Sequence, residues 1–170
     1  MTADLQTGRT RPMTTVLDIL RTRIDHDRFD AVVIALECVV ADLGYGDLRP
    51  LAGTIAWIDR LRSEGKSIAV VYSGSRAEEP LELAGVRDRF DAVVSGPRTA
   101  ATLRVALDGL GVAAERAVVV DLTPDGMSAA REVGAHLAIA LARGSATPEQ
   151  LRRGGADAIV ADLQELLGPT

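Results

Sequence analysis

Six short apolar runs, separated by helix-like stretches, restrict what this chain can fold into. The runs are rich in Val, Ile and Ala and cover residues 29–36, 67–73, 90–95, 116–122, 136–142 and 157–162. The helical stretches cover residues 51–64, 76–85, 99–110, 124–133, 147–153 and 163–167. Alternating strands and helices predict a parallel sheet, and continuously apolar strands indicate that both of its faces are covered. We therefore predict an α/β fold, a three-layer Rossmann-like parallel sheet of about six strands with helices on both faces.

The predicted elements form a single domain that follows a short tail. Residues 1–13 are polar, so we expect a flexible tail there. Residues 14–170 are long enough to bury a core as one domain. A helix is expected to begin at Thr14 or Thr15, because apolar residues follow these hydroxyls at helical spacing.

Composition limits the partners and the compartment that we expect. The net charge is −5 and aromatic residues make up 3% of the chain, so neither charge nor stacking favours a nucleic acid. No apolar run reaches the ~18 residues that a membrane span needs, so we expect no membrane partner. The single cysteine, Cys38, excludes an internal disulfide, and the first residues contain no apolar signal core. These features predict a cytoplasmic protein.

The carboxyl ends of the predicted strands are where a ligand site is expected. Open parallel sheets bind ligands beyond that edge. Three residues that could act as bases precede or open strands and are expected at the opposite edge: His26, Lys66 and His136. Cys38 lies in the site region without a neighbouring histidine, so a small buried side chain is a better interpretation than a thiol nucleophile. The sequence contains no phosphate-loop motif, no dinucleotide-binding glycine motif and no zinc-ligand spacing.

Several of these strands resemble motifs of the haloacid dehalogenase (HAD) superfamily, in family order over residues 27–168. FDAVVIALECVVAD resembles the first motif, a buried strand that ends in Asp-x-Asp-Gly, in the form found in the β-phosphoglucomutase-like branch. SIAVVYSGSR resembles the second motif, and RAVVVDLTPDGM resembles the fourth. The ending RRGGADAIVADLQEL is similar to the HAD-like N-terminal domain of actinobacterial trehalose-6-phosphate phosphatases. The resemblance implies a HAD-like core.

The positions that carry the chemistry of this superfamily differ here. Ala35 stands where the family has its nucleophilic aspartate, and a methyl group cannot attack phosphorus. Glu37 stands at the place of the acid–base aspartate and is the one vestigial catalytic candidate. Pro97 falls at the position of the family lysine, with Arg98 beside it, and the acidic pair reads Asp121-Leu122. The resemblance therefore implies a degenerate, hydrolase-like pseudoenzyme.

A helical cap of several dozen residues follows the first motif in the β-phosphoglucomutase-like branch. In this chain only ADLGYGDLR separates Val40 from Pro50, and its two glycines suggest a tight turn. We therefore expect no cap domain and a site that is open to water.

The residues with a possible binding role form two groups. Ser73, Gly74 and Ser75 lead from a predicted strand into a helix, where free backbone N–H groups favour an anion, and Arg98 would add positive charge. We predict that these four residues bind phosphate. Glu37 and Asp121 are weak candidates for holding a cation, and Asp121 has the alternative role of capping the following helix. We expect no cofactor beyond weakly bound Mg²⁺.

Two kinds of function remain open at this point. The first is a degenerate HAD-like domain with a regulatory, scaffolding or weak phosphate-ligand-binding role, whose partner is a protein or a phosphorylated small molecule. The second is a HAD-family hydrolase, a phosphatase related to trehalose-6-phosphate dephosphorylation. A receiver-like signalling domain, suggested by VVVDLTPDGM, is set aside because Lys66 is in the wrong place.

Overall fold

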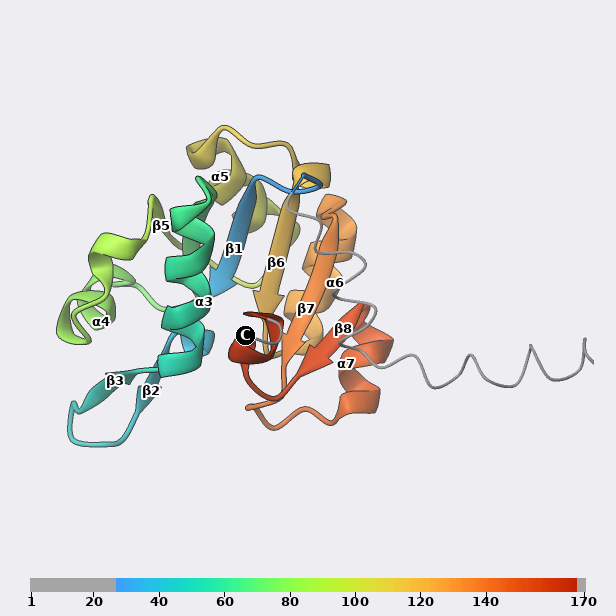
Figure 1. Cartoon of the computed structure of the whole chain (residues 1–170). Coiled ribbons are helices and arrows are strands. Elements are labelled where there is room, and N and C mark those ends of the chain that lie inside the picture. The colour runs from blue at the N-terminus through green and yellow to red at the C-terminus, as the bar shows by residue number, and fades with distance from the viewer. Residues whose placement is uncertain (1–26, 168–170) are drawn as a thin grey trace, which may run out of the picture.

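A single six-stranded sheet forms the centre of the protein in the computed structural model, which describes residues 27–167 (Figure 1). All of its strands are parallel, in the order β5-β4-β1-β6-β7-β8. The strands are β1 (Ala31–Ala35), β4 (Ser67–Tyr72), β5 (Ala92–Ser95), β6 (Ala117–Asp121), β7 (Leu137–Leu141) and β8 (Ala158–Val160). Each lies within one of the six apolar runs, so the predicted parallel sheet is confirmed.

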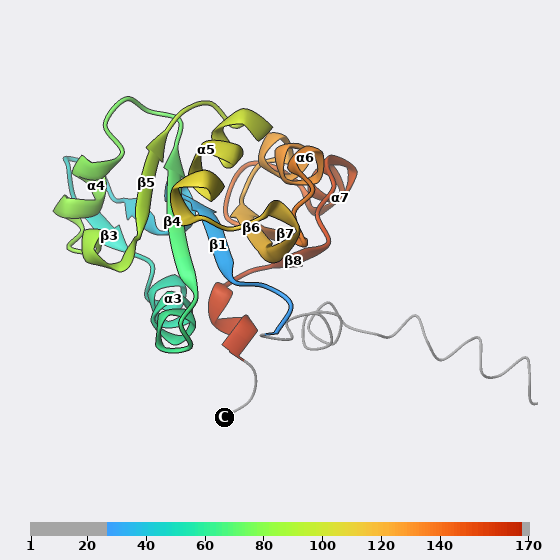
Figure 2. The same ribbon diagram turned by 90° about the horizontal axis from the view of Figure 1, so that it is seen from above.

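Helices cover both faces of this sheet (Figure 2). One face carries α3 (Ala52–Ser63) and the 3-10 helix η5 (Leu163–Leu167). The other carries α5 (Ala100–Leu110), α6 (Pro124–Val133) and α7 (Pro148–Gly154). Successive side chains of a strand point to opposite faces, and β1 accordingly sends Ile34 into the first core and Val33 into the second. The predicted three layers are thus confirmed.

Three threonines begin the main helices of the second face, and three glycines end them. The hydroxyls of Thr99, Thr123 and Thr147 each accept a hydrogen bond from the N–H three residues further on. Gly111, Gly134 and Gly155 follow these helices with φ of 67°, 84° and 119°, a left-handed backbone that glycine adopts without strain.

Two helical stretches differ from the prediction. The segment predicted over 76–85 is shorter, because α4 covers Glu78–Leu83 and starts at Ala77 without a side-chain cap. The closing stretch 163–167 is a 3-10 helix. Two further 3-10 turns are η3 (Arg87–Arg89) and η4 (Ala114–Arg116).

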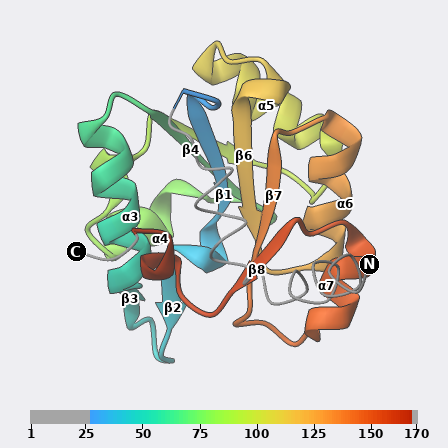
Figure 3. The same ribbon diagram turned by 45° about the vertical axis from the view of Figure 1, so that its right-hand side comes forward.

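A β-hairpin links the first strand to the first large helix. After β1 the chain makes a 3-10 turn, η2 (Leu36–Cys38), and then pairs β2 (Val40–Asp42) with β3 (Leu48–Pro50) in antiparallel register. The tip has φ of 93° at Gly44, 55° at Tyr45 and 76° at Gly46. Figure 3 shows this hairpin below α3, beyond the carboxyl ends of the strands. The prediction of a short connection without a helical cap agrees with this segment, whereas its paired strands were not predicted.

The amino edge of the sheet contains the basic residues that were expected there. The Lys66 ammonium donates to the carbonyl of Phe29 at 2.8 Å and lies 5.0 Å from the centre of its ring. His136 directly precedes β7. The predicted tail, the helix expected from Thr14 or Thr15, and His26 lie outside the described residues. Between residues 27 and 167, no helix has the length and apolar character to cross a membrane.

Candidate functional site

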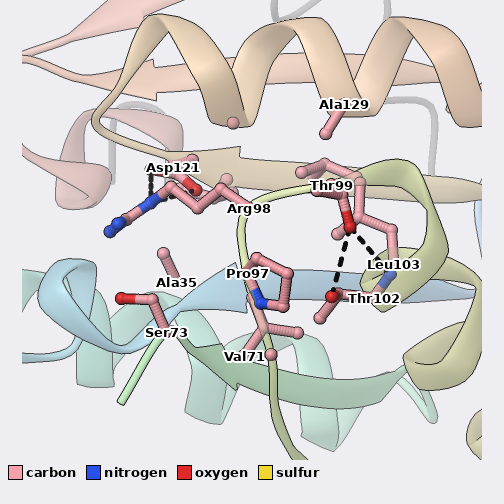
Figure 4. Close-up of a pocket in the computed structure, with 14 residues that line it drawn as sticks. Ala35, Val71, Ser73, Pro97, Arg98, Thr99, Thr102, Leu103, Asp121 and Ala129 are labelled. Carbon is pink, nitrogen blue, oxygen red and sulfur yellow. Dashed lines mark hydrogen bonds and ion pairs between the residues drawn. The ribbon is translucent and has the colours of Figure 1, made fainter.

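Side chains from four strand ends meet at the carboxyl edge of the sheet (Figure 4). Ala35 ends β1, Ser73 follows β4, Arg98 follows β5, and Asp121 ends β6. They surround a cavity of about 20 Å³, which is room for roughly one water molecule. The space between the four strand ends is therefore narrow, and it shares Ser73 and Arg98 with a wider hollow at the surface.

The guanidinium of Arg98 bridges two carboxylates within this site. Its Nε donates to both carboxylate oxygens of Asp121 at 3.3 Å. Its Nη2 forms an ion pair with Oε2 of Glu37, which lies in η2 directly after β1. The Asp121 side chain is only 5% exposed, so its charge depends on partners inside the protein. Arg98 is therefore part of an internal charge network.

Asp121 is also fixed by the backbone that follows it. Its Oδ1 accepts the N–H of Leu122 at 2.6 Å, the N–H of Thr123 at 3.1 Å and the hydroxyl of Thr123 at 3.1 Å. The Thr123 hydroxyl in turn accepts the N–H of Gly126 at 3.0 Å. A Cβ at Gly126 would overlap the Asp121 carboxylate. Asp121 thus holds the start of α6 in place, which was one of the two roles considered for it.

Only one of the two carboxylate oxygens of Glu37 has a partner among the described residues. Its Oε2 meets Arg98, while Oε1 is buried and has no hydrogen-bond partner within residues 27–167. A buried carboxylate oxygen without a donor is uncommon in folded proteins. This buried oxygen is therefore an acceptor that a donor or a cation could still use.

The four predicted phosphate-binding residues come together at the surface. Ser73, Gly74, Ser75 and Arg98 line a broad open hollow of about 550 Å³, together with Asp125. The electrostatics there do not favour an anion. Arg98 is paired with the carboxylates of Glu37 and Asp121, and a further carboxylate, that of Asp125, lines the hollow. These residues are neighbours, but their positive charge is already neutralised.

The helix that was predicted to begin directly after Ser73, Gly74 and Ser75 begins later in the structure. α4 begins at Glu78, and its first turn contains Glu78 and Glu79, whose charges oppose an anion at that end. Gly74 has a packing role, because a Cβ there would overlap the ring of Tyr72. The sequence pattern gave no indication of this contact, since it depends on how the Tyr72 ring turns at the end of β4.

Cys38 lies beneath the site and is fully buried. Burial raises the pKa of its thiol well above the usual value, and the charge of Asp121 raises it further. Its carbonyl oxygen accepts the hydroxyl of Thr54 at 2.7 Å, which ties η2 to α3. A neutral buried thiol is a poor nucleophile, so the structure supports the small-side-chain interpretation.

The superfamily resemblance implies Mg²⁺, and the donors present do not fit it as they are arranged. Mg²⁺ requires near-octahedral oxygen ligands. Arg98 already occupies the space between Glu37 and Asp121, and both oxygens of Asp121 accept hydrogen bonds. Among the described residues, no group of three or more His, Cys, Asp or Glu side chains is placed to hold a metal ion.

Solved structures with the same arrangement of elements are numerous. A HAD-family hydrolase from Deinococcus radiodurans superposes with a TM-score of 0.72 at 17% identity, over 82% of this chain and 93% of that one. A HAD-like hydrolase from Streptococcus pneumoniae gives 0.67 at 14% identity, over 82% and 97%. A β-phosphoglucomutase from Clostridium difficile gives 0.60 at 16% identity, over 69% and 52%. The protein therefore has the HAD-like fold.

One curated relative has a more specific similarity. Trehalose-phosphate phosphatase from Mycobacterium leprae is 31% identical over 151 residues, which are 85% of this chain and 33% of that protein. The chain thus spans about a third of the length of this relative. No family model matches the chain. The chain is accordingly a HAD-like domain related in sequence to a trehalose-phosphate phosphatase.

Proposed function

We propose that this chain is a non-catalytic HAD-like domain with a regulatory or scaffolding role beside a phosphatase. The observation that carries the proposal is the Arg98 guanidinium, which bridges Glu37 and Asp121 next to the methyl group of Ala35. These groups stand where the superfamily resemblance places the reaction centre. A centre whose guanidinium is already bridged by two carboxylates lacks the parts that phosphoryl transfer uses.

Three missing parts support the absence of catalysis. Ala35 has no atom that can form a covalent bond to phosphorus. The space of about 20 Å³ between the strand ends leaves little room for the transferred group. Electrostatic clamps supply much of the rate enhancement in phosphoryl transfer, and here the only guanidinium at the centre is engaged by carboxylates.

The curated relative supports the choice of partner. Because the similarity covers 33% of that phosphatase, a domain of this kind occurs there within a much longer chain. We propose that this domain contacts a catalytic unit that acts on a phosphorylated sugar, and that it does so in the cytoplasm. The single buried cysteine supports that compartment.

A turnover assay tests the proposal. The purified chain is incubated with p-nitrophenyl phosphate and, separately, with trehalose-6-phosphate in the presence of Mg²⁺. We expect no release of phosphate above the buffer rate, because Ala35 is no nucleophile and the Arg98 guanidinium is engaged by carboxylates of the described residues. The Glu37→Gln variant is the matched control, since it removes the one remaining acid–base candidate. Turnover that co-purifies with the chain and is lost in Glu37→Gln would contradict the proposal and favour an active phosphatase.

Weak binding of a phosphorylated small molecule is the second candidate, and the open hollow at Ser73, Gly74 and Ser75 favours it. The surplus of carboxylates predicts a dissociation constant no tighter than about a millimolar, or about 4 kcal/mol. Titration with inorganic phosphate, followed by amide NMR shifts of Gly74 and Ser75, measures it. Amides that do not move at tens of millimolar phosphate would leave only the regulatory or scaffolding role.

A further inference from the structure

We propose that Arg98 is a tethered cation that occupies the position between Glu37 and Asp121, and that its removal opens a site for a hard divalent cation. In this interpretation the chain carries its own positive charge at the centre of the site. The inference does not depend on the absence of catalysis, because cation binding and turnover are measured separately.

The strand order of the sheet brings Arg98 to both carboxylates. The sheet order is β5-β4-β1-β6, and Arg98 follows β5, whereas its two partners follow β1 and end β6. The side chain therefore extends across the ends of two strands to meet both carboxylates. Ala35, at the end of β1, leaves room along this path because its side chain is a single methyl group (Figure 4).

The burial of Asp121 explains why a positive charge is needed beside it. Asp121 is 5% exposed and Arg98 is 24% exposed, whereas Glu37 is 35% exposed, so water screens the Asp121 end of this network most weakly. Two carboxylates that share such a site repel each other unless a positive charge lies between them. The planar guanidinium supplies that charge, and its separate N–H groups reach both partners at once.

The oxygens that Arg98 holds are suitable ligands for a hard cation. Removing the guanidinium frees Oε2 of Glu37 and Oδ2 of Asp121, while Oε1 of Glu37 is already buried without a donor. Mg²⁺ retains several waters in proteins and is held by one or two carboxylates, and Mn²⁺ accepts the same oxygen ligands. The neutral variant of Arg98 therefore has the donors for a divalent cation, which the natural chain keeps occupied.

Mn²⁺ is the probe, because it also broadens nearby NMR signals. The wild type, Arg98→Gln, Arg98→Lys and the double variant Arg98→Gln/Glu37→Gln are titrated with MnCl₂ by calorimetry and by amide NMR. We expect Arg98→Gln to bind Mn²⁺ at least tenfold more tightly than the wild type, with broadening at Glu37, Leu122 and Thr123. Arg98→Lys keeps the positive charge and should behave as the wild type does. The double variant should lose the gain.

Two results would overturn the proposal. One is a wild-type chain that binds Mn²⁺ as tightly as Arg98→Gln, and the other is an Arg98→Gln chain that folds and binds no better than the wild type. Arg98→Met, with a neutral side chain of similar length, provides the same test if the glutamine variant does not fold. If both neutral variants require a cation to fold, Mn²⁺ should restore their native circular dichroism, and failure to do so at 10 mM would also overturn it.

Discussion

At the scale of single residues, the Asp121 carboxylate links the sheet, the next helix and the site. It accepts two backbone N–H groups and one hydroxyl from the loop before α6, and it also pairs with Arg98. A buried carboxylate is tolerated only when donors and charges of this kind surround it. The same contacts that stabilise the start of α6 therefore occupy both oxygens of this carboxylate.

Gly126 is predicted to be required by this carboxylate. The Gly126→Ala variant places a Cβ where the Asp121 side chain lies, so the carboxylate must move away from its donors. We expect the free energy of unfolding to fall by about 2 kcal/mol, the usual cost of overpacking a tight contact. Urea denaturation followed by circular dichroism measures this loss.

Gly109→Ala is the matched control for that experiment. Gly109 is also helical, but a Cβ there lies 3.7 Å from Ala92 and meets nothing closer, so it is accommodated. We expect a gain of about 0.5 kcal/mol from the better helix propensity of alanine. Equal losses in both variants would show that the Asp121 contact is not the cause.

Cys38 is predicted to be unreactive in the native protein. Burial and the charge of Asp121 raise the pKa of its thiol, so little thiolate exists near neutral pH. With Ellman's reagent at pH 8 we expect a native rate at least about 100-fold below that in urea, because reaction requires opening of the structure. A native rate close to the unfolded rate would indicate an accessible thiol.

The same thiol should make stability depend on alkaline pH. Its folded pKa lies above that of the unfolded chain, so its contribution is complete below about pH 8.5 and is lost as the pH rises beyond that value. Comparing the wild type with Cys38→Ala by urea denaturation at pH 7 and pH 9.5 isolates this contribution. We expect the wild type to lose more stability than the variant on going to pH 9.5, and equal losses would contradict the shift.

At the scale of elements, the pattern of apolar residues was sufficient to predict the strands of the sheet, but it was not sufficient to predict the hairpin. Each strand of the sheet is buried on both faces and reads as a continuous apolar run, so β1 and β6 are recognisable without any partner. The hairpin strands β2 and β3 contain three residues each and are half exposed. Short exposed strands have no apolar pattern, and their pairing depends on the turn at Gly44 and Gly46.

The helix caps were easier to predict than the site contacts. Thr123 precedes a proline and an apolar helix, a local pattern that indicates an N-cap. The contact of Arg98 with Glu37 and Asp121 joins three strand ends that lie far apart in the sequence. Their meeting depends on strand order and side-chain direction. The sequence could therefore predict which edge holds them, but not that Arg98 pairs with the two acids.

Thr123→Ala is predicted to cost more than Thr147→Ala. Both threonines cap helices, and Thr147 forms a reciprocal capping box with Gln150, whose loss costs about 1 kcal/mol. Thr123 also donates its hydroxyl to Asp121, so we expect about 2 kcal/mol for its replacement. Urea denaturation of both variants provides the comparison. Equal costs would show that the bond from Thr123 to Asp121 adds no stability.

At the scale of the whole molecule, the charge network and the two cores are parts of one structure. The sheet buries side chains against helices on both faces, and the carboxylate of Asp121 ends a strand of that sheet. Arg98 neutralises this carboxylate from within the chain. A fold that contains its own cation is expected to be stable without an added one.

The thermal stability of the natural chain should accordingly depend little on divalent cations. With Glu37 and Asp121 engaged by Arg98, we expect a Mg²⁺ dissociation constant no tighter than about a millimolar. At 1 mM Mg²⁺ a ligand of that affinity stabilises the native state by about 0.4 kcal/mol at most. For a chain of this size that corresponds to a change in Tm of about 1–2 °C. Differential scanning calorimetry in 1 mM MgCl₂ and in 1 mM EDTA measures it. A difference of more than about 5 °C would mean that a bound metal ion stabilises the fold, and that Arg98 does not fill the cation position.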